Sequence, residues 1–424
     1  MHAFKLLCLA LAACAPAPPW IDVVGAAECV HQIALDPAKE APPMRWEPRC
    51  PGDETPGCEH LLVTAGDGRL DGLDLVDGPA MVLDIYSSEH STAAYYDLEA
   101  RPLMMQRTAH GDADCRAQLA FGGGRAALLS TGGIHQGYAP AIVTAPFPGS
   151  AGWRGASPLH GERRILDAVF APLPDGRVAL VHGDYPEAFV VGPDRWDPLL
   201  GEQIDVIDAA IVGDRLALLT AHGALRILGL TGGPPTLHDP PGREIGALRS
   251  DGERLYWLEL PDDSDPGAPL TSTDVELRTS SIRAGEPLAP RVLARFPHLR
   301  YSSFFAGIRA FGASFHSPGL PHLGVGPGGV YVHVARDAED LLLLVRPSDG
   351  NTWAWTIGDG HRTPGLGPPD SAARPAKKPD VPELRSVIHL GEQWLVLNYA
   401  PGFELVRRYP LADFQIPAAA ITPR

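Results

Sequence analysis

The six cysteines are the residues of this chain whose chemistry depends most on their surroundings. They are Cys8, Cys14, Cys29, Cys50, Cys58 and Cys115. A thiol can form a disulfide, bind a metal ion or become acylated, and spacing and compartment decide between these. The spacings match neither a zinc motif nor a C-x-x-C-H haem motif. Acylation and disulfide formation therefore remain.

The apolar run LLCLALAAC near the start predicts an export signal. It follows Lys5 and is far shorter than the roughly twenty apolar residues that cross a bilayer. Its last four residues, LAAC at 11–14, resemble the signal box of bacterial lipoproteins. The resemblance implies that Cys14 is acylated and becomes the first residue. It also implies an outer-membrane lipoprotein, because Ala15 stands where an Asp would favour the inner membrane. An ordinary secretory signal is the alternative.

Four cysteines remain for the exported chain once the signal is removed and Cys14 is acylated. An even number in an oxidising compartment predicts two disulfides, with three connectivities open. Cys50 and Cys58 bracket the turn-rich stretch PGDETPG, so we favour this pair, which leaves Cys29 with Cys115. On the chain-entropy model the smaller loop contributes roughly 2–3 kcal/mol.

The composition predicts a folded, acidic protein. Hydrophobic residues make up 45% of the chain, enough for a large core, and the formal net charge is −16 at pH 7. An acidic exterior argues against nucleic acid as a partner and against docking on anionic lipid through charge. We therefore expect membrane contact through the lipid anchor only, and an envelope protein or a glycan as the partner.

One short motif recurs along the chain: a turn of Gly or Asp, often an Arg, and then a run of strand-like residues. The seven copies are GPAMVLDIY, GGRAALLS, DGRVALVHG, GDRLALLTA, DGERLYWLEL, GGVYVHVA and GEQWLVLNY. Other short apolar runs precede and follow several copies, so each unit predicts four antiparallel strands joined by tight turns. Repeating units of this kind predict an all-β fold, a β-propeller of seven blades.

The repeats resemble those of WD40- and quinoprotein-type propellers in pattern alone, because a W-D dipeptide does not recur at the ends of the repeats. The resemblance implies a ring closed by strands from both ends of the chain. HLLVTAGDGRL at 60–70 is expected to pair beside ELVRRYPLADF at 404–414. A pair of β-sandwiches, or a ring of six or eight blades, is the alternative.

These patterns divide the chain into four parts. We expect a signal peptide at 1–13, a Pro-rich, Cys-containing tether at 14–58, the propeller at 59–415 and a tail at 416–424.

The sequence contains no local catalytic motif. A G-x-S-x-G elbow, an H-E-x-x-H pair and a P-loop are missing, and no Rossmann glycine fingerprint is expected after a strand. We therefore expect no catalytic residues, no bound metal and no cofactor. The one weak exception is calcium at GDGRLDGLDL, where Asp67, Asp71 and Asp74 offer hard oxygens but Arg69 occupies a ligand position.

The segment 296–324, between the fifth and sixth repeats, is the best candidate binding surface. It concentrates aromatic residues with Arg and His, the residue types of binding hot spots. The residues expected to contribute most are Arg300, Tyr301, Phe304, Phe305 and His316. The alternative is that these aromatic side chains pack between the sheets of an ordinary blade.

Two functions fit this sequence. The first, which we favour, is an exported, lipid-anchored propeller that binds or scaffolds a partner at the cell envelope. The alternative is a hydrolase or lyase whose site lies in the central funnel. Such a site assembles His and carboxylate side chains from several blades, so it leaves no local motif.

Overall fold

The computed structural model describes most of the strands and many of the turns of the chain. The described residues are 20–26, 29–50, 56–63, 69–73, 81–86, 90–109, 116–131, 141–149, 153–158, 168–182, 188–192, 196–199, 206–220, 222–261, 274–282, 287–297, 322–326, 329–334, 339–348, 352–358, 383–390, 394–400 and 405–410.

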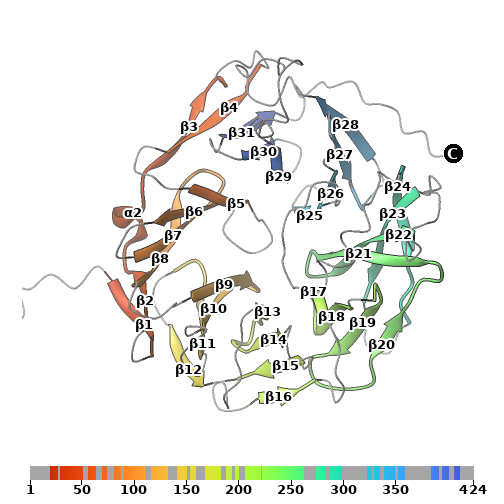
Figure 1. The fold of residues 1–424 in the computed structure, drawn as a ribbon, viewed down its shortest axis with the longest axis horizontal. Helices are drawn as coiled ribbons and strands as arrows, with labels where there is room; N and C mark the ends of the chain where they lie inside the picture. The colour runs from red at the N-terminus through yellow and green to blue at the C-terminus, as the bar shows by residue number, and fades with distance from the viewer. Residues whose placement is uncertain are drawn as a thin grey trace, which may run out of the picture.

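Seven antiparallel sheets stand around a central axis, so the chain is a seven-bladed β-propeller (Figure 1). This confirms the fold predicted from the repeats. Blades 2 to 6 have four strands each, which follow one another from the axis outward. They are β9 (Arg116–Gly122), β10 (Arg125–Thr131), β11 (Ala141–Pro146) and β12 (Arg154–Pro158); β13 (Ala168–Pro172), β14 (Val178–His182), β15 (Ala188–Val191) and β16 (Trp196–Pro198); β17 (Val206–Val212), β18 (Arg215–Thr220), β19 (Leu225–Gly229) and β20 (Thr236–His238); β21 (Arg243–Ser250), β22 (Arg254–Pro261), β23 (Asp274–Ser281) and β24 (Arg291–Pro297); and β25 (His322–Gly326), β26 (Gly329–Val334), β27 (Glu339–Val345) and β28 (Thr352–Gly358).

Blades 1 and 7 are larger because the N-terminal part of the chain adds strands to both. Blade 1 has, from the axis outward, β5 (Arg69–Leu73), β6 (Met81–Tyr86), β7 (His90–Tyr96), β8 (Pro102–Ala109), β2 (Cys29–Ala34) and β1 (Trp20–Ala26). Blade 7 has β29 (Glu383–Leu390), β30 (Trp394–Ala400), β31 (Leu405–Pro410), β4 (Glu59–Val63) and β3 (Met44–Pro48).

The ring closes in blade 7, where strands from the two ends of the chain meet. β31 pairs with β4 in the register Arg407↔His60 and Arg408↔Glu59. The predicted pairing is therefore confirmed for the part of 60–70 that lies in β4, whereas Arg69 and Leu70 belong to β5 of blade 1. Closure leaves neither strand as an open inner edge that could pair with another molecule.

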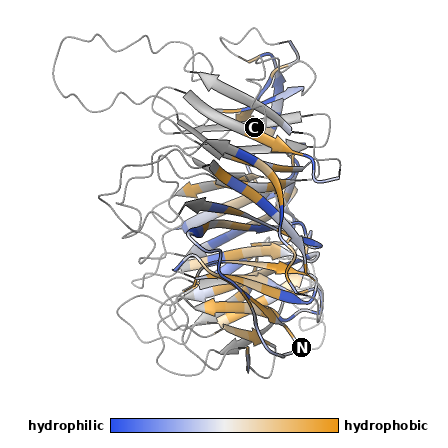
Figure 2. Cartoon of the chain, turned by 90° about the vertical axis from the view of Figure 1, so that its right-hand side faces the viewer, coloured by the Kyte–Doolittle hydropathy of each residue, from blue (hydrophilic) through white to orange (hydrophobic). Residues whose placement is uncertain are grey.

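Each of the seven sequence motifs contains the second strand of one blade, from β6 in the first to β30 in the last. β18 shows why these strands are almost continuously apolar. Leu216 and Leu218 pack toward blade 3, while Ala217 and Leu219 pack toward blade 5. Successive side chains point to opposite faces, and both faces of the sheet are covered. Figure 2 shows apolar residues (orange) running along strands in the middle of the molecule.

The two faces of the ring carry different kinds of connection. On the hairpin face lie the turns from first to second strand and from third to fourth strand. On the connection face lie the turns from second to third strand and the links between blades. The longest stretches between strands, 262–273, 298–321 and 359–382, all begin and end at the connection face.

The hairpin face is built from tight turns that touch each other. Gly123 and Gly124 join β9 to β10 with φ angles of 57° and 67°, which glycine adopts without strain. A Cβ on Gly123 would come within 2.9 Å of Pro174 in the next blade. Farther round the ring, Gly213 N–H donates to the carbonyl of Gly252 at 2.9 Å. Contacts between turns thus hold neighbouring blades together on the hairpin face.

The N-terminal segment differs from the tether that its composition predicted for 14–58. It forms β1 and β2, the short helix α2 (Pro37–Glu40) and β3, so the folded body extends to Trp20. The reason is that Ile33 and Ala34 are fully buried against blade 1. Residues 14–19 lie outside the described residues, as do the signal and the tail. None of the described helices is long and apolar enough to span a membrane.

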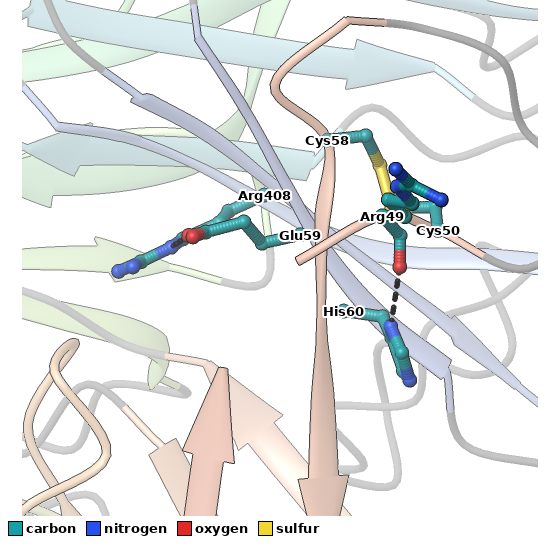
Figure 3. Close-up of a disulfide and its surroundings, with 6 residues drawn as sticks. All are labelled: Arg49, Cys50, Cys58, Glu59, His60 and Arg408. Carbon is teal, nitrogen blue, oxygen red and sulfur yellow. Dashed lines mark hydrogen bonds and ion pairs between the residues drawn. A yellow bond between two sulfur atoms is a disulfide. The ribbon is translucent and has the colours of Figure 1, made fainter. Parts of the chain in front are cut away.

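A disulfide joins Cys50 and Cys58, as the spacing predicted, with a Cα–Cα distance of 5.6 Å (Figure 3). It closes the hairpin between β3 and β4. Arg49 N–H donates to the carbonyl of Cys58 at 2.8 Å, and His60 Nδ1 lies 2.8 Å from the carbonyl of Arg49. The disulfide therefore holds the start of the closing strand β4 in place.

Candidate functional site

Most residues singled out from the sequence as site residues lie outside the described residues. These are Cys14, Cys115, Asp67, Asp74, Arg300, Tyr301, Phe304, Phe305 and His316. Cys29 and Asp71 lie in β2 and β5, but their side chains are not described. The lipidation, the second disulfide, the calcium site and the binding surface therefore stay predictions. The binding segment is located only by its ends, Pro297 in blade 5 and His322 in blade 6.

Blade 5 holds the two buried acidic side chains of the described residues, Glu259 and Glu276. They form the centre of a group that we call the Glu259 cluster. Its members are His238, Arg243, Trp257, Glu259, Glu276, Arg278 and Arg295.

The sheet register brings the two carboxylates together. Glu259 in β22 pairs with Glu276 in β23, which pairs with Arg295 in β24. Residues directly opposite each other share a face of the sheet, and two like charges in this arrangement repel. Arg278 offsets the repulsion, because its Nε lies 2.9 Å from Glu259 Oε2 and its Nη2 donates to Glu276 Oε2 at 2.6 Å.

The other oxygen of Glu259 binds groups from two blades. Trp257 Nε1 donates to Glu259 Oε1 at 2.9 Å, and His238 Nε2 lies 3.1 Å from the same oxygen. His238 belongs to β20, the outermost strand of blade 4. Its ring also meets the Trp257 ring edge-on, with centroids 5.7 Å apart. The carboxylate therefore ties blade 4 to blade 5.

The hydrogen bonds keep Glu259 ionised although it is only 1% exposed. Burial alone raises the pKa of a carboxyl group. In this cluster the hydrogen bonds from His238 and Trp257 and the charge of Arg278 outweigh burial, so the pKa of Glu259 lies below its usual value. A buried carboxylate is tolerated only with partners of this kind.

The geometry makes Glu259 a fixed structural charge rather than a base. Its Oε1 already accepts a hydrogen bond from Trp257 and its Oε2 is ion-paired with Arg278, whereas a general base must reach the proton that it removes. The open group of the cluster is Arg295, whose side chain is 53% exposed. Its Nε donates to Glu276 Oε1 at 3.0 Å, and its Nη atoms have no other partner among the described residues.

The cluster lies near the connection-face ends of β22, β23 and β24. β22 ends at Pro261, β23 begins at Asp274 and β24 ends at Pro297, so the ends of 262–273 and 298–321 lie beside it. Arg295 lies three positions before the start of the second stretch in the sequence. A guanidinium held through Nε can still offer two parallel N–H groups to a carboxylate.

Sequence reasoning missed this cluster, although a signal was present. Glu259 and Glu276 each interrupt an apolar strand, in YWLEL and DVELR. An acidic residue inside such a run predicts a buried, paired carboxylate. The pairing itself depends on the register of β22 with β23, which the repeat pattern does not give.

A second buried polar group lies between blades 1 and 2. His31 in β2 is fully buried, with Nδ1 3.0 Å from Thr108 Oγ1 and Nε2 2.6 Å from Ser130 Oγ. Desolvation lowers the pKa of His31 to about 4. Although a Ser–His pair suggests nucleophilic catalysis, all three side chains are buried, so no substrate reaches them. The group instead ties the N-terminal hairpin to two blades.

Across the described ranges, no three His, Cys, Asp or Glu side chains are placed so that they could hold a metal ion. The weak Asp cluster predicted for calcium is not tested by this observation, because two of its members lie outside those ranges.

No family model and no curated protein matches this sequence. Solved structures with a similar fold include YCF48 bound to a D1 peptide, at 11% identity and a TM-score of 0.38, covering 93% of this chain and 96% of that one. Virginiamycin B lyase from Staphylococcus aureus has 9% identity and a TM-score of 0.43, covering 83% and 98%. The dihydro-heme d1 dehydrogenase NirN has 12% identity and a TM-score of 0.43, covering 95% and 75%. At these values none of the three informs on a ligand or partner of this chain.

Proposed function

We propose that this protein is an exported propeller, anchored to the outer membrane through Cys14, that binds a partner protein on its connection face above blade 5. The observation that carries the binding proposal is the position of the Arg295 guanidinium. This group is half exposed and oriented by Glu276 at the point where the segment 298–321 leaves the blade. A preorganised guanidinium favours a carboxylate of the partner.

The candidate segment supplies the apolar part of the same surface. Arg300, Tyr301, Phe304, Phe305 and His316 follow Arg295 in the sequence. Aromatic and Arg side chains are the types that contribute most of the free energy at protein interfaces. The Glu259 cluster supports this surface because it fixes the end of β24, after which the segment begins.

Photo-crosslinking in the cells that make this protein tests the binding proposal. A benzophenone amino acid at Phe305 should give a discrete adduct with one protein, and Arg295→Ala should reduce the yield. The control position is Glu253, which is exposed on the hairpin face of the same blade. Equal adducts at both positions, or an adduct at Phe305 that Arg295→Ala leaves unchanged, would contradict the proposal.

The anchoring proposal has its own test. Cys14→Ser should abolish acyl labelling and move the protein out of the membrane fraction, because a lipidated Cys is the expected anchor. A variant that stays membrane-bound and is processed like the wild type would show that Cys14 is not the anchor.

A further inference from the structure

We infer that the outer edge of blade 1 lies against the lipid bilayer near its hairpin-face end, which leaves the connection face free of the membrane. The contact is a surface patch formed by Trp20, Leu35 and Lys39, which we call the blade 1 patch. The inference rests on the proposed acylation of Cys14, and it adds the orientation of the propeller and the surface that touches lipid.

The first argument is the length of chain between the anchor and the folded body. Only residues 15–19 separate Cys14 from Trp20, and three of them are proline. A fully extended or polyproline stretch of this length spans roughly 20 Å. A folded chain of this size is on the order of 55 Å across. The tether therefore keeps blade 1 at the bilayer, and in the inferred orientation blades 4 and 5 lie on the opposite side of the ring from it (Figure 1).

The second argument is the direction in which the chain enters. β1 is antiparallel to β2, and β2 is antiparallel to β8. β1 thus runs in the same sense as β8, from the hairpin face toward the connection face. Trp20 and Leu98 pack against the same core cluster, which includes Ala100, and Leu98 and Ala100 belong to a hairpin-face turn. The described chain consequently begins at the hairpin face, which leaves the connection face open to a partner.

The third argument is the chemistry of the residues around the entry point. Leu35 is 40% exposed and is one of two large hydrophobic side chains that are exposed in the described part of the chain. It follows Ala34, the register partner of Trp20. Lys39 is 79% exposed, and its ion pair with Asp36 at 2.7 Å is weak because both groups face solvent. Trp, Leu and a flexible Lys are typical of surfaces that lie at the lipid headgroups.

The test uses the lipidated protein in vesicles of phosphatidylethanolamine and phosphatidylglycerol that contain a nitroxide-labelled lipid. A bimane label is placed at Lys39→Cys or, as the control, at Leu237→Cys, the other exposed leucine, in β20 of blade 4. Because the inferred orientation places blade 4 on the side of the ring away from the bilayer, quenching at position 39 should exceed that at position 237 by about twofold or more. Equal quenching at the two positions would overturn the inferred orientation.

Two further variants separate the patch from the tether and from the anchor. Leu35→Asp should reduce quenching at position 39, whereas Leu237→Asp should not; if Leu35→Asp has no effect, the patch does not touch lipid. Mass spectrometry of the same sample detects the acyl chains on Cys14. A protein without them refutes the proposed anchoring, and the inference fails with it. An acylated protein with equal quenching refutes the orientation alone.

Discussion

Glu59 and Arg408 are 349 positions apart in the sequence and form an ion pair between the strands that close the ring (Figure 3). Arg408 also stacks on the Trp46 ring, with Cζ 4.5 Å from its centroid, and lies 3.5 Å from Glu99 of blade 1. One largely buried guanidinium thus joins β31, β4, β3 and the neighbouring blade. The closure depends on side chains as well as on strand pairing.

Deleting residues 404–414 should open the ring, because it removes β31 with Arg407 and Arg408. β4 would lose its inner partner and become an unpaired edge, which promotes aggregation. We expect aggregated or protease-sensitive protein, measured by gel filtration and limited proteolysis. The control deletion is 416–424, which follows the last described strand. A 404–414 deletion that melts like the intact protein would show that the blades do not form one closed ring.

The disulfide between Cys50 and Cys58 should stabilise the same ring closure, because it holds the hairpin that contains β4. Mass spectrometry of the mature protein should find Cys50 bonded to Cys58, and Cys50→Ser combined with Cys58→Ser should lower stability by about 2–3 kcal/mol. Chemical denaturation measures the difference. Both thiols alkylatable without reduction would contradict the bond. Under the same conditions, Cys29 and Cys115 should also be protected if the second predicted disulfide forms.

Much of the fold could be predicted because every blade buries both faces of its second strand. That burial makes β10, β14 and β18 nearly continuous apolar runs, which are visible in a single sequence. The pairing of β4 with β31 followed from the need to close a ring. The N-terminal hairpin was missed because prolines before Trp20 and around α2 dominate the local composition. The strand character of this hairpin becomes clear only from the burial of Ile33 and Ala34 in blade 1.

The Glu259 cluster could not be predicted, because it depends on register. Glu259 and Glu276 are separated by the stretch 262–273, whose length does not determine which residues face each other. A shift by one residue would place one carboxylate on the other face of the sheet. The contact between Glu259 and His238 further depends on how far blades 4 and 5 are shifted relative to each other along their strands.

Arg278→Met should strongly destabilise blade 5, because Glu259 and Glu276 would then face each other without the guanidinium between them. Breaking a buried ion pair on one side costs about 3–5 kcal/mol. Adding Glu276→Gln removes one of the two charges and should recover part of the loss. Denaturant unfolding of the single and double variants measures the coupling between them. Strictly additive effects would show that Arg278 does not act through the two carboxylates.

The same cluster predicts a loss of stability in acid. The pKa of Glu259 is held below its usual value in the folded protein. Its contribution is therefore fully present above the unfolded-state pKa and is lost as the pH falls through the lower folded-state value. Glu259→Gln should flatten the thermal unfolding profile in that acidic range and leave the slope near neutral pH unchanged. An unchanged acidic slope would mean that Glu259 is not a linked group.

His31 predicts a separate loss of stability at a higher pH. The folded-state pKa is about 4 and the ordinary pKa of an unperturbed His is 6.5, so the unfolded chain binds more protons between these values. Stability from this group is complete above about pH 6.5, falls as the pH drops toward about 4, and then changes no further. The shift corresponds to at most about 3 kcal/mol.

His31→Gln keeps a polar side chain but cannot titrate. It should be less stable than the wild type at neutral pH, but its stability should no longer fall between pH 6.5 and pH 4. The measurement is the urea midpoint across the pH range, with His222→Gln as the control for an exposed histidine. If the urea midpoints of the wild type and of His31→Gln fall in parallel between pH 6.5 and pH 4, protonation of His31 is not the cause of the loss of stability.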